Sequence, residues 1–242
     1  MLSISIFLIA FAFVSTHGKD RDNINKYIDE ILSTSLPKAV ENISLDLNEI
    51  PDFSFNVQNS SEENESFGGT VMFDLGNMTG LNVVKRKYCE PSSKAPGSIS
   101  IVCTVVLPRV VVNYRGRFQE IIGSASSKED QVLYRDFYGE NFIRNAEAQL
   151  ELTTFEDLNN PALTNFQLLR IREVRKEFHY DDAVENNVSH QIFVPFDEIS
   201  EPFYQKSLYV FQHVFYGPYR SALEKSVGGV KYPEISLRSS ST

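Results

Sequence analysis

The chain contains 242 residues, of which 32 are acidic and 23 are Lys or Arg, so its net charge is −9. No basic block interrupts this acidic balance. A nucleic-acid partner and an electrostatic attachment to anionic membranes both need such a block, so the composition argues against both.

The first residues have the pattern of a secretory signal peptide. A mostly apolar run, Ile4–Val14, precedes small and polar residues and then charges that begin at Lys19. We place the cleavage after Gly18. This predicts a signal peptide at residues 1–18, a single domain at residues 19–242 and a secreted, extracellular protein.

Two further features agree with secretion. Cys89 and Cys103 are the only cysteines, and an isolated pair in a secreted chain predicts one disulfide. The chain also carries five sequons for N-linked glycans, which we expect on at least two of them. The sequons begin at Asn42, Asn59, Asn64, Asn77 and Asn187.

The N-terminal part of the mature chain is predicted to be helical. Asp22–Ser35 has apolar residues at helical spacing on one side, while Asp29 and Glu30 face away. Pro37 is expected to bend or end this helix, and a second short helix is plausible after it. The polar stretch Asp52–Ser66 is predicted to be a surface connector.

The hydrophobic period then changes to two. Thr70–Leu75 and Leu81–Lys87 each alternate and are predicted to form a hairpin with a turn at Gly76-Asn77. Glu90–Gly97, rich in Pro, Ser and Gly, is predicted to be a loop.

Ile99–Phe118 is the strongest β signal in the chain, and we expect an interruption at Pro108 that curves the sheet. Val132–Phe142 is ambiguous, with a strand favoured, and Asn145–Thr154 alternates clearly. Phe166–Tyr180 alternates basic with apolar residues, which is typical of an antiparallel sheet with one solvated face.

The stretch Ser200–Ser226 is predicted to be a long, mostly aromatic helix, capped at Ser200 and ended by Gly228-Gly229. Pro218 is expected to kink it. Its longest window without full charges, Ser207–Tyr219, has thirteen residues, fewer than the ~18–20 that a bilayer needs. We expect this helix either to be an ordinary core helix or to form one wall of a ligand cavity.

The order helix, meander of long strands, helix predicts an α+β fold. A curved antiparallel sheet needs another element to bury its second face, and the C-terminal helix is the best filler of the concave face.

The sequence contains no recognisable catalytic constellation. His179, His190 and His213 lack metal-ligand spacing, and no zinc-protease, nucleophile-elbow or phosphate-loop motif occurs. We therefore expect a protein that is not an enzyme and has no metal or cofactor.

One further pattern lies in the stretch Gly69–Arg86. Its residues are Gly69, Asp74, Asn77, Met78, Gly80, Leu81, Lys85 and Arg86. With these residues the stretch resembles the group-seven mite allergens and their arthropod relatives. The resemblance implies a tubular lipid-binding fold, as in juvenile-hormone-binding and bactericidal permeability-increasing proteins. In that fold a highly curved antiparallel sheet, a half-barrel super-roll, wraps a long C-terminal helix and leaves an apolar groove.

Two functions are compatible with these observations. The first is a carrier or sensor that binds a hydrophobic small molecule or lipid in a groove between sheet and helix, without integral membrane association. The second is a glycosylated structural or interaction protein with a fully packed core and no ligand. For the first function, the predicted lining residues are Phe203, Leu208, Phe211, Val214 and Phe215 on the helix, and Val105, Leu107, Val110 and Val112 on the sheet.

Overall fold

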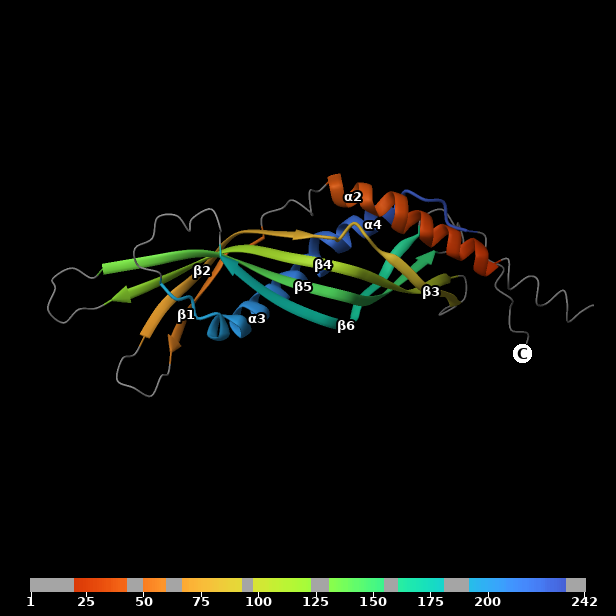
Figure 1. Ribbon diagram of the computed structural model, residues 1–242. Coiled ribbons are helices and arrows are strands. Elements are labelled where there is room, and N and C mark those ends of the chain that lie inside the picture. The colour runs from red at the N-terminus through yellow and green to blue at the C-terminus, as the bar shows by residue number, and fades with distance from the viewer. Residues whose placement is uncertain are drawn as a thin grey trace, which may run out of the picture.

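The computed structural model describes residues 20–42, 50–59, 67–92, 98–122, 131–154, 161–180 and 192–233. Within them, one long curved antiparallel sheet lies against helices from both ends of the chain (Figure 1). The predicted α+β fold, a curled half-barrel sheet with a long C-terminal helix and an N-terminal helix, is therefore confirmed. The predicted signal peptide lies outside the described residues.

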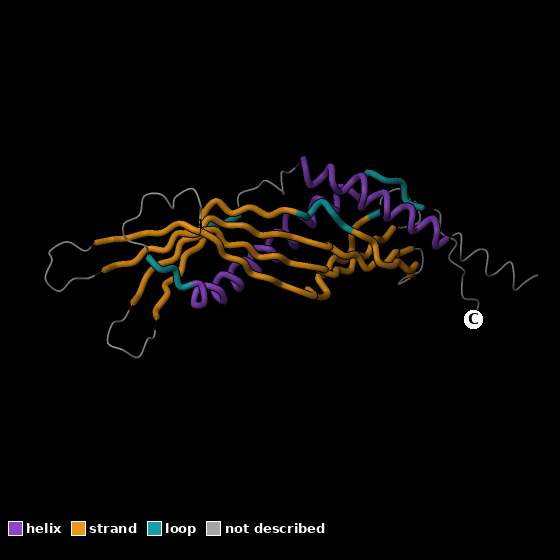
Figure 2. The backbone as a smooth tube through the Cα atoms, in the orientation of Figure 1, coloured by secondary structure: helices purple, strands orange, loops and turns teal. Residues whose placement is uncertain are grey.

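The sheet has the strand order β1-β2-β4-β5-β6, and β3 pairs with the remaining part of the β4 edge. All pairs are antiparallel. Figure 2 shows the strands spreading apart at one end and the long C-terminal helix passing behind them. The strands are β1 (Phe53–Asn59), β2 (Phe67–Thr79), β3 (Lys85–Ser92), β4 (Ile99–Ile122), β5 (Gln131–Thr154) and β6 (Ala162–Tyr180).

β4 and β5 pair along their whole length, and both change face at the same point. Pro108 lies opposite Asn145, whose φ is 50°. Before the break the buried core residues of β4 are Ile101, Cys103, Val105 and Leu107, whereas after it they are Val110, Val112, Tyr114, Gly116 and Phe118. The predicted interruption at Pro108 is confirmed, although the strand continues through it.

The position of Pro108 also suits its missing N–H group. β3 covers one edge of β4 up to Val106, and β2 covers the same edge from Val111 onward. Pro108 falls in the gap between these two neighbours, so it removes no ladder hydrogen bond on that edge.

The predicted hairpin at Gly76-Asn77 is wrong. β2 continues through these residues with a bulge, and β3 then runs onward in the same direction along β4. Gly76 lies against the Tyr114 ring, where a Cβ atom would clash, so close packing explains this glycine better than a turn does. A local turn follows at Gly80, whose φ is +87°, and it does not reverse the direction of the chain.

Three other strand boundaries differ from expectation. The predicted connector Asp52–Ser66 contains strand β1, in which Phe53, Phe55 and Val57 alternate with polar residues. β3 extends into the predicted loop as far as Ser92. The segments expected before and after residue 144 form the single strand β5, because the change of face at Asn145 interrupts the pattern without ending the strand.

The N-terminal helix is longer than expected. Residues 20–30 continue through a π-helical turn, η1 (Ile31–Ser35), into α2 (Leu36–Asn42). Pro37 neither ends this helix nor separates a second one, because the wider turn before it changes the backbone bonding, with the Leu36 N–H donating to the Ile31 carbonyl.

The C-terminal helix also continues through Pro218, by way of a π-helical turn. α3 (Phe196–Val214), η3 (Phe215–Tyr219) and α4 (Arg220–Gly228) follow one another without a break, and η3 is a π-helical turn around Pro218. The helix begins at Phe196 rather than after Ser200, with two acidic residues in its first turn. It ends at Gly228, as expected.

The structure contains the predicted disulfide. Cys89 and Cys103 are directly paired residues of β3 and β4, with Cα atoms 4.1 Å apart, and both side chains are buried.

We predict that replacing both cysteines with serine lowers the free energy of unfolding by about 3 kcal/mol, because the bond closes a short loop in the unfolded chain. Urea unfolding of wild type and double variant, each with and without reductant, measures this difference. Reductant should destabilise only the wild type, and two reactive thiols in denatured, unreduced wild type would contradict the bond.

Candidate functional site

The predicted lining residues form a packed interface between α3, η3 and the concave face of the sheet. Leu208 is half-buried, and the other eight are at most 6% exposed. The eight are Phe203, Phe211, Val214, Phe215, Val105, Leu107, Val110 and Val112. Their role in ligand binding stays a prediction.

Aromatic rings fill much of this interface. The Phe203 ring lies 4.8 Å from that of Phe73 and sits over Gly139, where a Cβ atom would be 3.1 Å from it. The Phe215 ring stacks on that of Phe166 at 4.4 Å. Such contacts are those of a close-packed core.

One buried polar pair joins α3 to the sheet. The Asn141 side-chain amide donates to the Ser207 hydroxyl at 2.7 Å, and both residues are fully buried. The Asn141 Oδ1 atom has no hydrogen-bond partner among the described residues. Because separating α3 from β5 would leave this amide without its hydroxyl acceptor, the pair helps to fix where the helix lies.

Open space lies beside α3. A hollow of about 320 Å³ separates the helix from the start of β1. Its walls are mainly apolar, with a few polar groups, as is usual in small-molecule sites. The lining residues are Pro51, Asp52, Phe53, Lys206, Tyr209, Val210 and His213.

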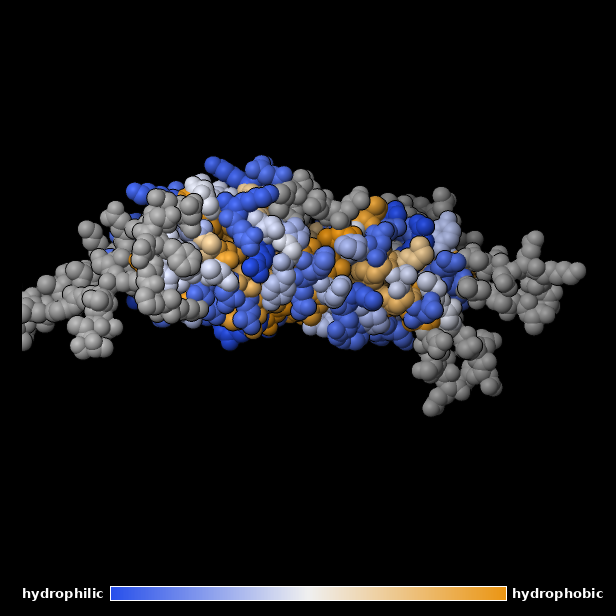
Figure 3. All heavy atoms as spheres, turned by 180° about the vertical axis from the view of Figure 1, so that it is seen from behind, coloured by the Kyte–Doolittle hydropathy of each residue, from blue (hydrophilic) through white to orange (hydrophobic). Residues whose placement is uncertain are grey.

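A second hollow of about 400 Å³ continues along the helix toward η3. It shares Tyr209 and His213 with the first, and it also meets Gln212, Tyr216 and Gly217. Seen from the helix side, the molecular surface has an apolar band across its middle, bordered by polar residues (Figure 3). We call the two hollows together the α3 groove.

Hydrogen bonds hold the β1 side of the α3 groove in place. The buried Tyr114 hydroxyl donates to the Pro51 carbonyl at 2.9 Å, and the Ile50 N–H donates to the Gly76 carbonyl at 3.2 Å. Burial, and to a lesser extent the Asp52 carboxylate, raises the pKa of Tyr114, so its hydroxyl keeps the proton that it donates. This wall is therefore formed without a ligand.

The charged groups of the α3 groove lie at one end, and Gln212, His213 and Tyr216 add further polar side chains toward the other. Lys206 and Asp52 line the first hollow but form no ion pair with each other or with another described residue. At the other end, the Tyr216 hydroxyl accepts a hydrogen bond from the Leu168 N–H at 3.1 Å, which ties η3 to β6. The arrangement can bind an apolar molecule that has one polar end.

None of the nine predicted lining residues lines the α3 groove. The residues missed are those of the unexpected strand β1 and of the outer side of α3, chiefly Phe53, Tyr209 and His213. One signal was available: Phe53, Phe55 and Val57 alternate with polar residues, which indicates a strand.

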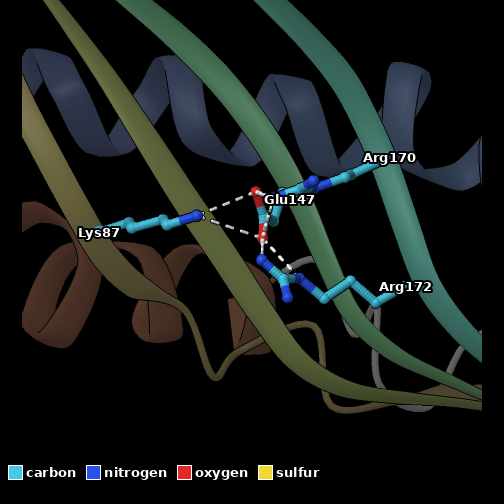
Figure 4. A network of polar contacts seen from close by, with 4 residues as sticks. All are labelled: Lys87, Glu147, Arg170 and Arg172. Atoms are coloured by element: carbon cyan, nitrogen blue, oxygen red, sulfur yellow. Dashed lines mark hydrogen bonds and ion pairs between the residues drawn. The ribbon is translucent and has the colours of Figure 1, made fainter.

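The convex face of the sheet carries a separate polar cluster (Figure 4). The Glu147 carboxylate on β5 is 6% exposed and contacts Lys87 of β3 at 3.3 Å, Arg170 of β6 at 2.9 Å and Arg172 of β6 at 2.7 Å. Hydrogen bonds from Arg172, and then from Arg170 and Lys87, outweigh desolvation and lower the pKa of Glu147 to about 2. The cluster cross-links three strands.

The described sequons differ in accessibility. Asn42 is exposed at the end of α2. Asn77 lies within β2, and its side-chain oxygen accepts a hydrogen bond from the Asn113 side chain at 2.9 Å. Asn59 ends β1, while Asn64 and Asn187 lie outside the described residues. Use of these sites stays a prediction.

Within the described ranges, no three His, Cys, Asp or Glu side chains come together in a way that could hold a metal ion. None of the described helices combines the length and the apolar character needed to cross a bilayer.

No protein-family model and no curated protein matches the sequence. Among solved structures, that of a lipopolysaccharide binding protein is similar, with 12% identity and a TM-score of 0.37. The match covers 87% of this chain and 37% of that one, so this chain spans little more than a third of that protein's length. A likeness this distant carries no argument, and the fold described above rests on the strand pairing alone.

We predict that Tyr114→Phe loosens the groove wall. Loss of its hydrogen bond to Pro51 should lower the free energy of unfolding by about 0.5–1.5 kcal/mol. Hydrogen exchange at Phe53, followed by NMR, should become faster than in the wild type. Unchanged exchange there would show that this bond does not hold the wall.

We predict a pH-dependent loss of stability in Glu147→Gln. The carboxylate's folded pKa of about 2 lies below its ordinary value of 4.5, so its stabilisation is complete above about pH 4.5 and disappears as the pH falls toward 2. The variant should melt below the wild type at neutral pH, and the difference should vanish near pH 2.

Circular dichroism melts across this pH range provide the measurement. Glu173→Gln is the control, because its half-exposed carboxylate has one ion pair among the described residues, with Arg144 at 3.4 Å, and should matter less. A Glu147→Gln difference that stays constant with pH would contradict the network's electrostatic role.

Proposed function

We propose that this protein is a secreted, non-enzymatic carrier or sensor that binds a hydrophobic small molecule or lipid between the helix and the curved sheet. The observation that carries the proposal is the α3 groove, which is apolar, elongated and walled by Phe53 on β1 and by Tyr209 and Val210 on α3. Burial of apolar ligand surface there would supply the binding free energy.

Two further observations support the proposal, one on secretion and one on kinship. The Cys89–Cys103 disulfide is typical of proteins that fold in an oxidising compartment. The half-barrel sheet with its C-terminal helix also agrees with what the resemblance to group-seven mite allergens implies. Kinship with those arthropod proteins is part of the same proposal.

The alternative, a structural or interaction protein without a ligand, is favoured by one observation. The rings of Phe203 and Phe215 pack closely against the sheet beneath the helix, and both side chains are fully buried. A carrier whose ligand lies beneath the helix would therefore have to displace these rings. Binding beside the helix, in the α3 groove, requires no such displacement.

We predict that His213→Trp weakens binding of an apolar fluorescent probe, N-phenyl-1-naphthylamine, without lowering stability. His213 is exposed and lines both hollows, so the larger ring should fill the groove and change the free energy of unfolding by less than about 0.5 kcal/mol. Phe215→Trp, in the packed interface, should instead destabilise by about 1–3 kcal/mol.

The measurement combines probe titration with thermal unfolding. Ser221→Trp, at an exposed α4 position outside the groove, is the matched control and should change neither quantity. The chain has no tryptophan, so each introduced ring also reports on its own surroundings. A wild type that binds no probe removes the carrier and leaves the interaction protein, and weakening by Phe215→Trp alone would place the ligand beneath the helix.

A further inference from the structure

We propose that the α3 groove accepts a linear amphiphile with a neutral hydroxyl head, that this head lies between Lys206 and Asp52, and that Gly217 sets the length of chain accepted. The inference rests on the proposed function and deepens it by naming the class of ligand. It follows from the shape of the groove, the charges at one end and the missing side chain at the other.

The groove follows one face of the helix. Six of its helical lining residues are linked by steps of three and four, which places them on one side of the helix. They are Lys206, Tyr209, Val210, His213, Tyr216 and Gly217. From Lys206 to Gly217 the helix rises about 16 Å, at ~1.5 Å per residue. This is about half the ~30 Å thickness of a bilayer's hydrocarbon core, and so about the length of one acyl chain.

The charges at the Lys206 end select the head group. Lys206 and Asp52 line the same hollow, yet neither makes an ion pair with a described residue. A hydroxyl can accept a hydrogen bond from the ammonium and donate one to the carboxylate, which satisfies both groups. A carboxylate or an ammonium head would be attracted by one of these two charges and repelled by the other, so neither gains the net attraction that a single opposite charge would give it.

Gly217 lies at the opposite end. A Cβ atom added there would meet no atom within 4 Å, so the absent side chain leaves open space in the second hollow. The residue lies in the π-helical turn η3 and is not among those with positive φ, so its backbone does not require glycine. The glycine therefore leaves space for a ligand in the second hollow. Tyr216 also lines this hollow, and its hydroxyl accepts the hydrogen bond from the Leu168 N–H.

The chain-length test uses Gly217→Phe in the full mature chain. Octanol, dodecanol and hexadecanol are titrated as competitors of N-phenyl-1-naphthylamine. The wild type should bind hexadecanol most tightly, and the variant should lose roughly tenfold in affinity for every two methylenes excluded. Its affinity for octanol should remain that of the wild type.

Gly228→Phe is the matched control. Gly228 is also a helical glycine with no atom within 4 Å of an added Cβ, but it lies outside the groove at the end of α4. Gly217→Leu repeats the test with a smaller side chain, and a melting curve of each variant confirms folding. An equal loss for all three alcohols, or no loss for any of them, overturns the role of Gly217.

The head-group test compares dodecanol, dodecanoate and dodecylamine on the wild type, Asp52→Asn and Lys206→Gln. The wild type should prefer the alcohol. Asp52→Asn should improve dodecanoate binding by about two- to fivefold, and Lys206→Gln should do the same for dodecylamine. A wild type that prefers dodecanoate or dodecylamine overturns the assigned head group while the carrier stands, whereas a wild type that binds none of the competitors or the probe overturns the proposed function itself.

Discussion

The pairing of β4 with β5 positions every other element that the structure describes. The two strands keep one register from the pair Ile99 and Thr154 at one end to the pair Ile122 and Gln131 at the other. β2, β3 and β6 each pair directly with one of them, and β1 is attached through β2. So long a twisted ladder curves, and its apolar concave face must be buried against another element. The α3–α4 helix provides that cover, and the N-terminal helix packs against α4 (Figure 1).

The concave face is covered in two different ways. Beneath α3, phenylalanine rings fit against strand glycines such as Gly139, and close packing excludes a ligand unless those rings move. Beside α3, the strand β1 begins at Phe53. The space between the helix and the start of this strand is open and forms the first hollow of the α3 groove. A single helix thus contributes both to the stability of the core and to a possible binding surface.

The sequence was a good guide where its pattern was long and periodic. The alternation in Ile99–Phe118 and its break at Pro108 predicted β4 and its change of face, and the isolated cysteine pair predicted the disulfide. It was a poor guide where tertiary contacts decide. Gly76 has the character of a turn residue but is required by the Tyr114 ring across the sheet, and β1 is too short to stand out from a polar stretch. For the same reason the groove was not predicted. It lies between β1 and the outer side of α3, whereas the predicted lining residues lie on the inner side of that helix and on the sheet.

The matched break at Pro108 and Asn145 has a consequence for how this protein can evolve. Each strand changes face at the same rung, so the buried residues of one remain opposite the buried residues of the other on both sides of the break. A single residue inserted or deleted in only one of the two strands would turn half of its apolar side chains toward water. Length variation among homologues is therefore constrained to paired events in β4 and β5, or to the loops beyond them.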